Sequence, residues 1–292
     1  MVINPGTTYQ ELRTSIQAEK DDRVRVHQAR IASAQRLSFA GAGPVALNLI
    51  AQGDSWFDYP LPIPKIDQSD VIAHLRRASI APEILSVAVH GETAEDMLGV
   101  VKIHDLFDKF GNPANGKFDA ILFSGGGNDI AGNQFRLWLN DAKGKPPKSA
   151  NGLNAQRVAC ILGVVRAGYE DLIKERDKVA KGTPIFAHSY DFAIPSGVGV
   201  ACVGPWLRPG LDDRGWTDPV AARAIVKAIL LEFDAMLEGF AAVPANNFVH
   251  VRTQGTLADG QWANELHPNP SGFAAIAAKF VDALRSRFPG RI

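Results

Sequence analysis

The chain has 292 residues, of which 46% are hydrophobic and 21% are charged. This composition is typical of a globular protein and excludes a largely disordered one. Lysine plus arginine and aspartate plus glutamate number 31 each, so the formal net charge is zero. We therefore expect no nucleic-acid partner, because proteins that bind polyanions normally carry a basic excess.

The N-terminal segment is polar and charged, with only scattered apolar residues from Thr8 to Arg36. We expect residues 1–40 to form a helical arm on the surface of one large domain, residues 41–292; such an arm could also support a homo-oligomer. The first thirty residues lack the apolar core of a secretory signal, and no apolar run is long enough to cross a bilayer. The sequence thus predicts a cytoplasmic protein with no integral membrane segment.

Five short apolar runs, each bounded by turn residues or a polar motif, predict strands that are buried on both faces of a parallel sheet. These runs are Val45–Ala51, Ile84–Val89, Phe118–Ser124, Pro184–Ala187 and Phe248–Val251. Helical patterns are expected at Ser69–Ser79, Thr93–Phe110, Asn154–Val179, Pro219–Phe240 and Pro270–Phe288. The alternation of strand and helix predicts an α/β fold, a three-layer α/β/α sandwich.

Three details refine this prediction. Thr93 and Asp96 have the spacing of a capping box, and Pro270 suits the first position of a helix. Residues 143–152 and 194–216 are rich in glycine and proline and predict loops. The second loop is long for a compact domain, and loops of that length are often functional.

Small and polar residues follow the first three predicted strands. They are Gly53-Asp54-Ser55, His90-Gly91-Glu92-Thr93 and Gly125-Gly126-Gly127-Asn128-Asp129. In open parallel sheets, ligands bind beyond the carboxyl ends of the strands. The three segments therefore predict one site at that edge of the sheet.

Ser55 is the candidate nucleophile, and a helix N-cap is the alternative for a serine that follows a strand. A serine nucleophile needs a base, and His267 lies in a polar turn just before the last predicted helix. The alternative for His267 is a capping or surface histidine. His90 follows the second strand and could also line the site.

Acyl transfer further requires donors for an oxyanion. The backbone amide of Gly91 and the side-chain amide of Asn128 are candidates, although a glycine-rich turn can also be purely structural. No Gly-Lys-Ser/Thr follows the glycines, which excludes a P-loop. Ser55 lies between Gly53 and Phe57, so the G-x-S-x-G elbow is absent as well.

Taken in chain order, these motifs resemble the four blocks of the SGNH (GDSL-type) hydrolases. Gly53-Asp54-Ser55 resembles the nucleophile block, Gly91 the second block, Gly126-Gly127-Asn128-Asp129 the G-x-N-D block, and His267-Pro268 the histidine block. The resemblance implies a flavodoxin-like five-stranded parallel sheet and a catalytic domain at residues 41–292. It implies that Ser55 is the nucleophile, that His267 is the general base, and that the Ser55 amide, the Gly91 amide and the Asn128 side chain form the oxyanion hole. No cofactor or metal is implied, and the substrate would be an acyl ester, a lysophospholipid or an O-acetyl sugar.

One position departs from this pattern. The family usually has aspartate three residues before the histidine, where this chain has Asn264. An amide oxygen can still hold the imidazole ring, although it supplies no charge. We expect Asn264 in this role, with Glu265, a backbone carbonyl or a dyad without a third residue as alternatives.

Two other functions are weighed against an esterase. A metal-dependent phosphoesterase would need a convergent set of His and Asp ligands, and the chain has no D-x-H, G-N-H or H-x-H motif. A hydrolase-like binding module is compatible with Asn264.

The aromatic residues either wall a substrate pocket or pack over the sheet edge; they are Trp56, Phe57, Tyr59, Trp206 and Trp216. Cys160 and Cys202 predict two free, buried thiols rather than a zinc site or a disulfide.

Overall fold

The centre of the molecule is a sheet of five parallel strands. The structure is a computed structural model that describes residues 8–39, 46–59, 69–143, 148–200 and 203–292. The strands are β1 (Asn48–Gly53), β2 (Glu83–Ser86), β3 (Ala120–Ser124), β4 (Ile185–His188) and β5 (Phe248–Val251). Their order is β2-β1-β3-β4-β5, and every pairing is parallel. The predicted five-stranded parallel sheet is confirmed, with each strand within a few residues of its expected place.

Strands β1 and β3 lie near the middle of the sheet and are buried along their whole lengths. Burial on both faces explains why their sequences are apolar runs rather than alternating patterns. Their register pairs Gly53 with Ser124 at the carboxyl ends of the two strands. The segments that follow β1 and β3 therefore start side by side.

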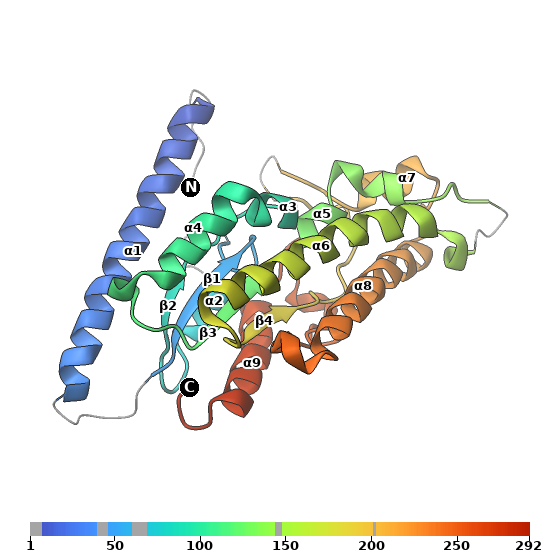
Figure 1. The fold of residues 1–292 in the computed structure, drawn as a ribbon. Coiled ribbons are helices and arrows are strands. Elements are labelled where there is room, and N and C mark those ends of the chain that lie inside the picture. Colours follow the sequence, from blue (N-terminus) through green and yellow to red (C-terminus); the bar gives the residue numbers. More distant parts are fainter. Residues whose placement is uncertain (1–7, 40–45, 60–68, 144–147, 201–202) are drawn as a thin grey trace.

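Helices cover both faces of the sheet (Figure 1). On one face lie α4 (Val100–Gly111), α6 (Ala155–Ala180) and α8 (Pro219–Ala241); on the other, α2 (Val71–Leu75) packs against α9 (Pro270–Arg287). This division follows from right-handed crossovers, since the chain steps one way from β1 to β2 and the opposite way afterwards. The predicted three-layer α/β/α sandwich is confirmed.

The short helices differ from the prediction. The helix expected at Thr93–Phe110 is two helices, α3 (Ala94–Leu98) and α4, separated by Gly99 in an extended conformation. The predicted capping box at Thr93 and Asp96 is present. Two further helices, α5 (Gly127–Ile130) and α7 (Arg208–Asp213), occupy segments predicted as turn and loop. Helices of four to six residues are too short to show a periodic pattern and depend on their neighbours for stability.

The N-terminal segment is a single long helix, α1 (Tyr9–Phe39), as predicted. Figure 1 shows it standing beside the body of the domain, where it packs along β2. The guanidinium of Arg23 donates to the Ala88 carbonyl at 3.0 Å and to Asp58 Oδ1 at 2.7 Å, and the ring of His27 stacks on Phe118. The expected boundary at residue 40 lies outside the described residues, and association of two chains through α1 stays a prediction.

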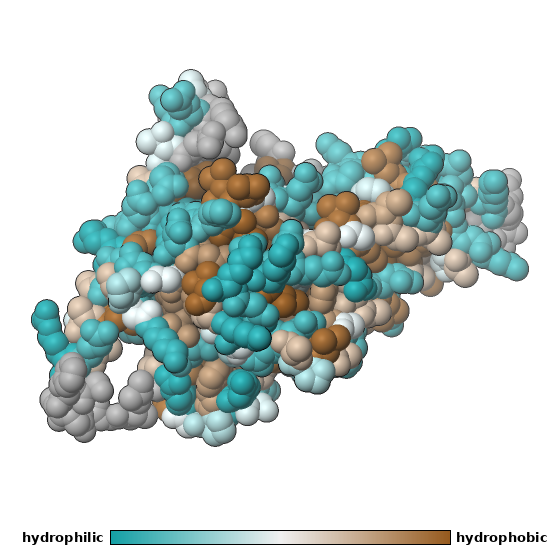
Figure 2. Space-filling view, in the orientation of Figure 1, coloured by the Kyte–Doolittle hydropathy of each residue, from teal (hydrophilic) through white to brown (hydrophobic). Residues whose placement is uncertain are grey.

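The surface of the molecule carries hydrophilic and hydrophobic residues side by side. Figure 2 shows hydrophilic and hydrophobic residues interspersed over the face formed by α4, α6 and α8. Among the helices that the structure describes, none is both long and apolar enough to span a membrane. Cys160 is a free thiol on the exposed side of α6, so its predicted burial is wrong; Cys202 lies outside the described residues.

Candidate active site

Ser55 lies in a tight turn at the carboxyl end of β1. The turn is closed by a 3.0 Å hydrogen bond from the Phe57 amide to the Asp54 carbonyl. A Cβ atom at Gly53 would lie 2.8 Å from the Phe57 ring and 2.9 Å from Ser124 Cβ, so only glycine allows the turn to fold back this closely. The Gly-Asp-Ser sequence thus places the Ser55 side chain beyond the sheet edge, as predicted.

The alternative role of Ser55 as a helix N-cap is wrong. Residues 55–59 form a turn and no helix, and the next helix among the described residues, α2, begins at Val71 with Asp70 as its N-cap, whose side chain accepts from the Ala73 amide. Instead, the Ser55 hydroxyl is directed at a histidine.

That histidine is His267, whose Nε2 lies 2.7 Å from Ser55 Oγ. His267 Nδ1 lies 2.9 Å from Asn264 Oδ1, and all three side chains are buried. The structure therefore brings together Ser55, His267 and Asn264 in the linear order that the sequence predicted.

The hydrogen bonds around Asn264 determine the tautomer of His267. Asn264 Oδ1 also accepts from the backbone amides of Leu266, at 3.0 Å, and His267, at 2.9 Å. Since both amides can only donate, the atom that they face is the carbonyl oxygen rather than the amide nitrogen. His267 Nδ1 must then carry the proton, which leaves Nε2 as the acceptor opposite the Ser55 hydroxyl group.

Glu265, the alternative to Asn264, faces away from His267 and anchors the loop before α7. Its Oε1 accepts from the amides of Gly197 at 2.9 Å and Arg208 at 3.0 Å. Its Oε2 accepts from the amides of Trp206 at 2.5 Å and Leu207 at 2.7 Å. A fully buried carboxylate with four amide donors is a structural anchor, and it holds the predicted 194–216 loop against the site.

Two aromatic rings flank His267. The rings of Tyr59 and Trp206 have centroids 5.0 Å and 5.5 Å from that of the imidazole. The indole of Trp56 donates to the Leu266 carbonyl at 3.0 Å and so ties the Ser55 turn to the His267 turn. Trp216 lies elsewhere, buried with its indole on the Asn140 carbonyl, so it contributes to packing rather than to this wall.

Asn128 lies in α5, directly after the glycines that follow β3. Its side-chain amide donates one proton to the Glu92 carbonyl at 2.9 Å, and among the described residues the second amide proton has no acceptor. The next residue, Asp129, accepts from the Ala94 amide at 2.7 Å. These two contacts bind the turn after β3 to the turn after β2, and Asn128 lines the same cavity as Ser55.

Gly91 lies in an exposed turn after β2, with a φ of +80°. Among the described residues, no hydrogen bond joins its amide to Ser55 or to any other group. The neighbouring His90 is close enough to affect the pKa of His267. The turn therefore flanks the site, and the role of the Gly91 amide stays a prediction.

A cavity opens beside Ser55 and His267. Its volume is about 50 Å³, and the side toward α5, α7 and α8 is apolar. The apolar wall includes Ile130, Phe135, Leu207, Val226, Ile229 and Leu230. Trp56 lines the cavity, whereas Phe57 is buried in the core beneath it. Of the two roles expected for the aromatic residues, Trp56 therefore walls a pocket and Phe57 packs in the core.

Burial controls the electrostatics of the site. It lowers the pKa of His267 to about 4, with a smaller effect from the positive charge that His90 can carry. It raises the pKa of Asp54 to about 6, although hydrogen bonds from Tyr190, the Trp56 amide and Ser124 oppose this shift. Within the described ranges, no group of three or more His, Cys, Asp and Glu side chains is placed to hold a metal ion.

Sequence reasoning missed the residues that support the site from below. Asp54 belongs to the Gly-Asp-Ser motif, but nothing in the motif shows that its carboxylate is buried and bonded to Ser124 and Tyr190. Tyr190 follows β4 and has a positive φ of 58°. The sequence did offer one indication of Tyr190: a polar segment follows the fourth strand, and the segments after the first three strands were already predicted to form the site.

Comparison with solved structures finds proteins that are similar in fold to this chain. The lipase Lip_vut3 from a goat rumen metagenome matches with a TM-score of 0.54 and 13% identity, over 82% of this chain and 97% of that one. An extracellular lipase from Streptomyces rimosus matches with a TM-score of 0.45 and 16% identity, over 82% and 99% of the two chains. A carbohydrate esterase of family 3 from Talaromyces cellulolyticus matches with a TM-score of 0.44 and 14% identity, over 82% and 97%.

No protein-family model matches the chain, and no curated protein does either. At these identities the likeness concerns the fold, and among these three structures it rests on the goat rumen lipase. The protein has the fold of the SGNH (GDSL-type) hydrolases, as its sequence motifs predicted.

Glu265→Gln should destabilise the protein. The amide group would replace one of the two oxygens and present N–H donors to backbone amides that also donate. We expect a loss of about 2–3 kcal/mol in the free energy of unfolding, measured by urea denaturation. Glu175→Gln, which changes the same group at a half-buried position of α6 where Glu175 pairs with the exposed Lys178, is the control and should have little effect. Equal stability of the Glu265 variant and the wild type would contradict this role.

Asn264→Asp should raise the pKa of His267. A carboxylate in contact with Nδ1 stabilises the imidazolium, so we expect a rise of about 1–2 units from the wild-type value of about 4. NMR titration of the His267 ring measures it. Asn269→Asp adds the same charge at the N-cap of α9 and should shift this pKa much less. Similar titration curves for wild type and Asn264→Asp would exclude contact between the two side chains.

Proposed function

We propose that the protein is a serine esterase that hydrolyses a carboxylic ester through an acyl-enzyme on Ser55. The observation that carries the proposal is the chain of contacts from Ser55 Oγ to His267 Nε2 at 2.7 Å and from His267 Nδ1 to Asn264 Oδ1 at 2.9 Å. A serine with a base in hydrogen-bond reach, and a third group that orients the base, is the general pattern of an activated nucleophile.

In the first half of the reaction, Ser55 Oγ attacks the ester carbonyl carbon and transfers its proton to His267 Nε2. The tetrahedral intermediate collapses when His267 gives this proton to the oxygen of the leaving alcohol. In the second half, His267 takes a proton from water, and the resulting hydroxide attacks the acyl-enzyme. Collapse of the second intermediate returns the proton to Ser55 Oγ and releases the carboxylic acid.

The negative oxygen of each intermediate needs fixed donors. The free amide proton of Asn128 and the backbone amide of Ser55 are the donors we assign, and the Gly91 amide is a third if its turn closes over the substrate. Asn128 is supported by its contact with the Glu92 carbonyl, which fixes the orientation of the side-chain amide. Loss of one such donor typically lowers the rate by about 10²–10³.

The cavity supports a short acyl group as the part of the substrate that is buried. Its volume of about 50 Å³ is roughly a third of an apolar cavity that holds benzene. The apolar wall is continuous with α5, which carries Asn128, so an acyl chain can enter it while its carbonyl oxygen faces the amide. The alcohol would then leave on the side of His267.

A fluorophosphonate should label Ser55. The reagent phosphonylates a serine, with loss of fluoride, only when a base has activated it, so we expect an adduct on Ser55 in the wild type and none in Ser55→Ala. His267→Ala should react at least about 100-fold more slowly. Mass spectrometry locates the adduct, and hydrolysis of p-nitrophenyl acetate measures turnover. A folded wild-type chain that shows neither labelling nor turnover would favour the alternative of a hydrolase-like binding module.

Leu230→Ala should shift the preference toward longer acyl chains. Leu230 lines the apolar side of the cavity, and truncating it enlarges the space for the acyl group. We expect the ratio of kcat/KM for p-nitrophenyl octanoate to that for the acetate to rise by about 10-fold. Leu237→Ala on the same helix removes another buried leucine side chain, one that does not line the cavity, and is the control. An unchanged ratio in Leu230→Ala would mean that the cavity does not hold the acyl chain.

A further inference from the structure

A directed chain of hydrogen bonds lies beneath the candidate nucleophile. The Tyr190 hydroxyl donates to Asp54 Oδ2 at 2.6 Å, and the hydroxyl oxygen of Tyr190 itself accepts from the Gly127 amide at 3.2 Å. The Ser124 hydroxyl donates to Asp54 Oδ1 at 2.8 Å. The carboxylate of Asp54 therefore accepts one hydrogen bond from a hydroxyl at the end of β3 and one from a hydroxyl in the segment after β4.

His188 completes the chain and fixes its direction. The Tyr190 amide donates to His188 Nδ1 at 3.2 Å, so the proton of this imidazole is on Nε2, which donates to Ser124 Oγ at 2.8 Å. The Ser124 proton is then free to bond Asp54. Burial lowers the pKa of His188 to about 3, which keeps the ring neutral and this direction unchanged at neutral pH.

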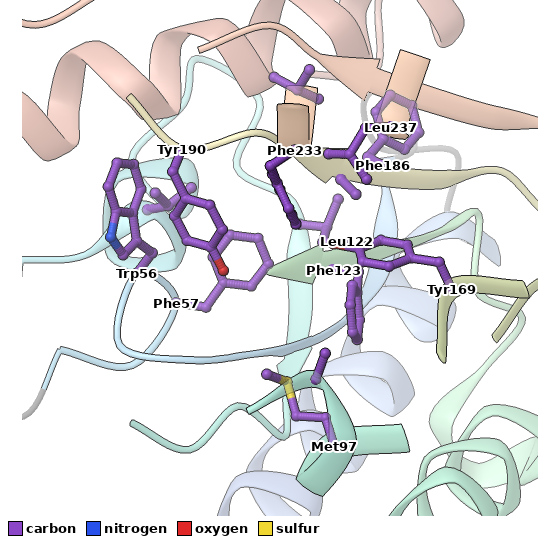
Figure 3. Packing of buried hydrophobic residues seen from close by; sticks show 14 of the residues in the cluster. Trp56, Phe57, Met97, Leu122, Phe123, Tyr169, Phe186, Tyr190, Phe233 and Leu237 are labelled. Carbon is purple, nitrogen blue, oxygen red and sulfur yellow. The ribbon is translucent and has the colours of Figure 1, made fainter. Parts of the chain in front are cut away.

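Tyr190 is held in this position against its backbone preference. Its φ of 58° lies in the left-handed region, which bulky residues rarely adopt. Figure 3 shows the Tyr190 ring between Trp56 and Phe233, with ring centroids 5.2 Å and 5.7 Å away. Backbone strain of this kind persists only where the surroundings enforce it, and it gathers at functional sites.

The turn that carries Asn128 is shaped around the same hydroxyl. A Cβ atom at Gly127 would lie 2.8 Å from Tyr190 Cζ, so a side chain larger than hydrogen would push the two apart. Gly127 directly precedes Asn128, and Asp54 directly precedes Ser55. One oxygen atom thus bonds the neighbour of the candidate nucleophile and the neighbour of the candidate oxyanion donor.

We propose that Tyr190 is a positioning residue, whose hydroxyl sets the distance between the Ser55 turn and the Asn128 turn. The inference rests on the proposed esterase function, since it gives Tyr190 its role through the nucleophile and the oxyanion donor. Tyr190 does not touch the reacting atoms. It acts because a donor must meet the oxyanion within a few tenths of an ångström, and a misplacement of 1 Å can lower a rate by about 100-fold.

The test is a double-mutant cycle on the full chain with p-nitrophenyl acetate as the substrate. We expect Tyr190→Phe, which removes one oxygen atom, to lower kcat by about 10-fold to 100-fold and to change KM by less than about 2-fold. In an Asn128→Ala background the oxyanion donor is already lost. There Tyr190→Phe should lower kcat by less than about 3-fold, because the two effects share one cause.

Tyr169→Phe is the matched control. Tyr169 is also buried, and its hydroxyl donates to the Gly125 carbonyl at 2.8 Å without bonding Asp54. We expect a similar change in the free energy of unfolding for both tyrosine variants, while kcat falls only in Tyr190→Phe. If Tyr190→Phe does not fold, Gly127→Ala displaces the same hydroxyl and takes its place in the cycle.

Three results would overturn the inference. The first is a kcat for Tyr190→Phe within about 2-fold of the wild type. The second is an equal loss of kcat in the wild-type and Asn128→Ala backgrounds, since additive effects indicate independent causes. If a fluorophosphonate labels Ser55 in the wild type, either of these two results overturns the role of Tyr190 while the proposed esterase function stands. The third is a wild-type chain that is neither labelled nor active, which overturns the esterase and the role of Tyr190 together.

Discussion

The buried carboxylate of Asp54 is the interaction on which the geometry of the site depends. A carboxylate without solvent is tolerable only when its oxygens accept several hydrogen bonds. Asp54 meets this need with Ser124 from the end of β3, Tyr190 from beyond β4 and the Trp56 amide in its own turn. Satisfying one carboxylate therefore brings three strand ends together, and the glycines at 53 and 127 provide the space in which they meet.

The sequence could predict what depends on local pattern. Continuous apolar runs located the five strands, and the rule that ligands bind beyond strand ends predicted that Ser55, Gly91 and Asn128 lie at one edge. The need of a serine nucleophile for a base then pointed to His267. Tyr190 could not be found in this way, because it lies 136 residues after Asp54 and belongs to no motif. Its role arises from tertiary contacts that no sequence period records. The short helix α7 was missed for the same reason, since it is held by the loop that Glu265 anchors.

The choice between Asn264 and Glu265 shows where sequence position alone fails. The two residues are adjacent, and both side chains have an oxygen that could hold an imidazole ring. In the turn before His267, consecutive side chains point to opposite sides, so Asn264 meets His267 while Glu265 meets the amides at 206 and 207. The division is physically consistent: four amide donors need a charged acceptor with two oxygens, whereas the imidazole needs only one oxygen to fix its tautomer.

A neutral partner for His267 changes where the stabilisation of the transition state must come from. With a pKa of about 4, His267 is available as a base at neutral pH but is a weak one, because general bases work best when their pKa is near the operating pH. In the proposed reaction, the negative oxygen of the tetrahedral intermediate would stabilise the protonated imidazole, as an aspartate would have done. That charge can build up only if fixed donors meet it, so an esterase with Asn264 depends more heavily on its oxyanion hole. This dependence gives a reason for a tyrosine to be held in a strained conformation in order to fix Asn128 relative to Ser55.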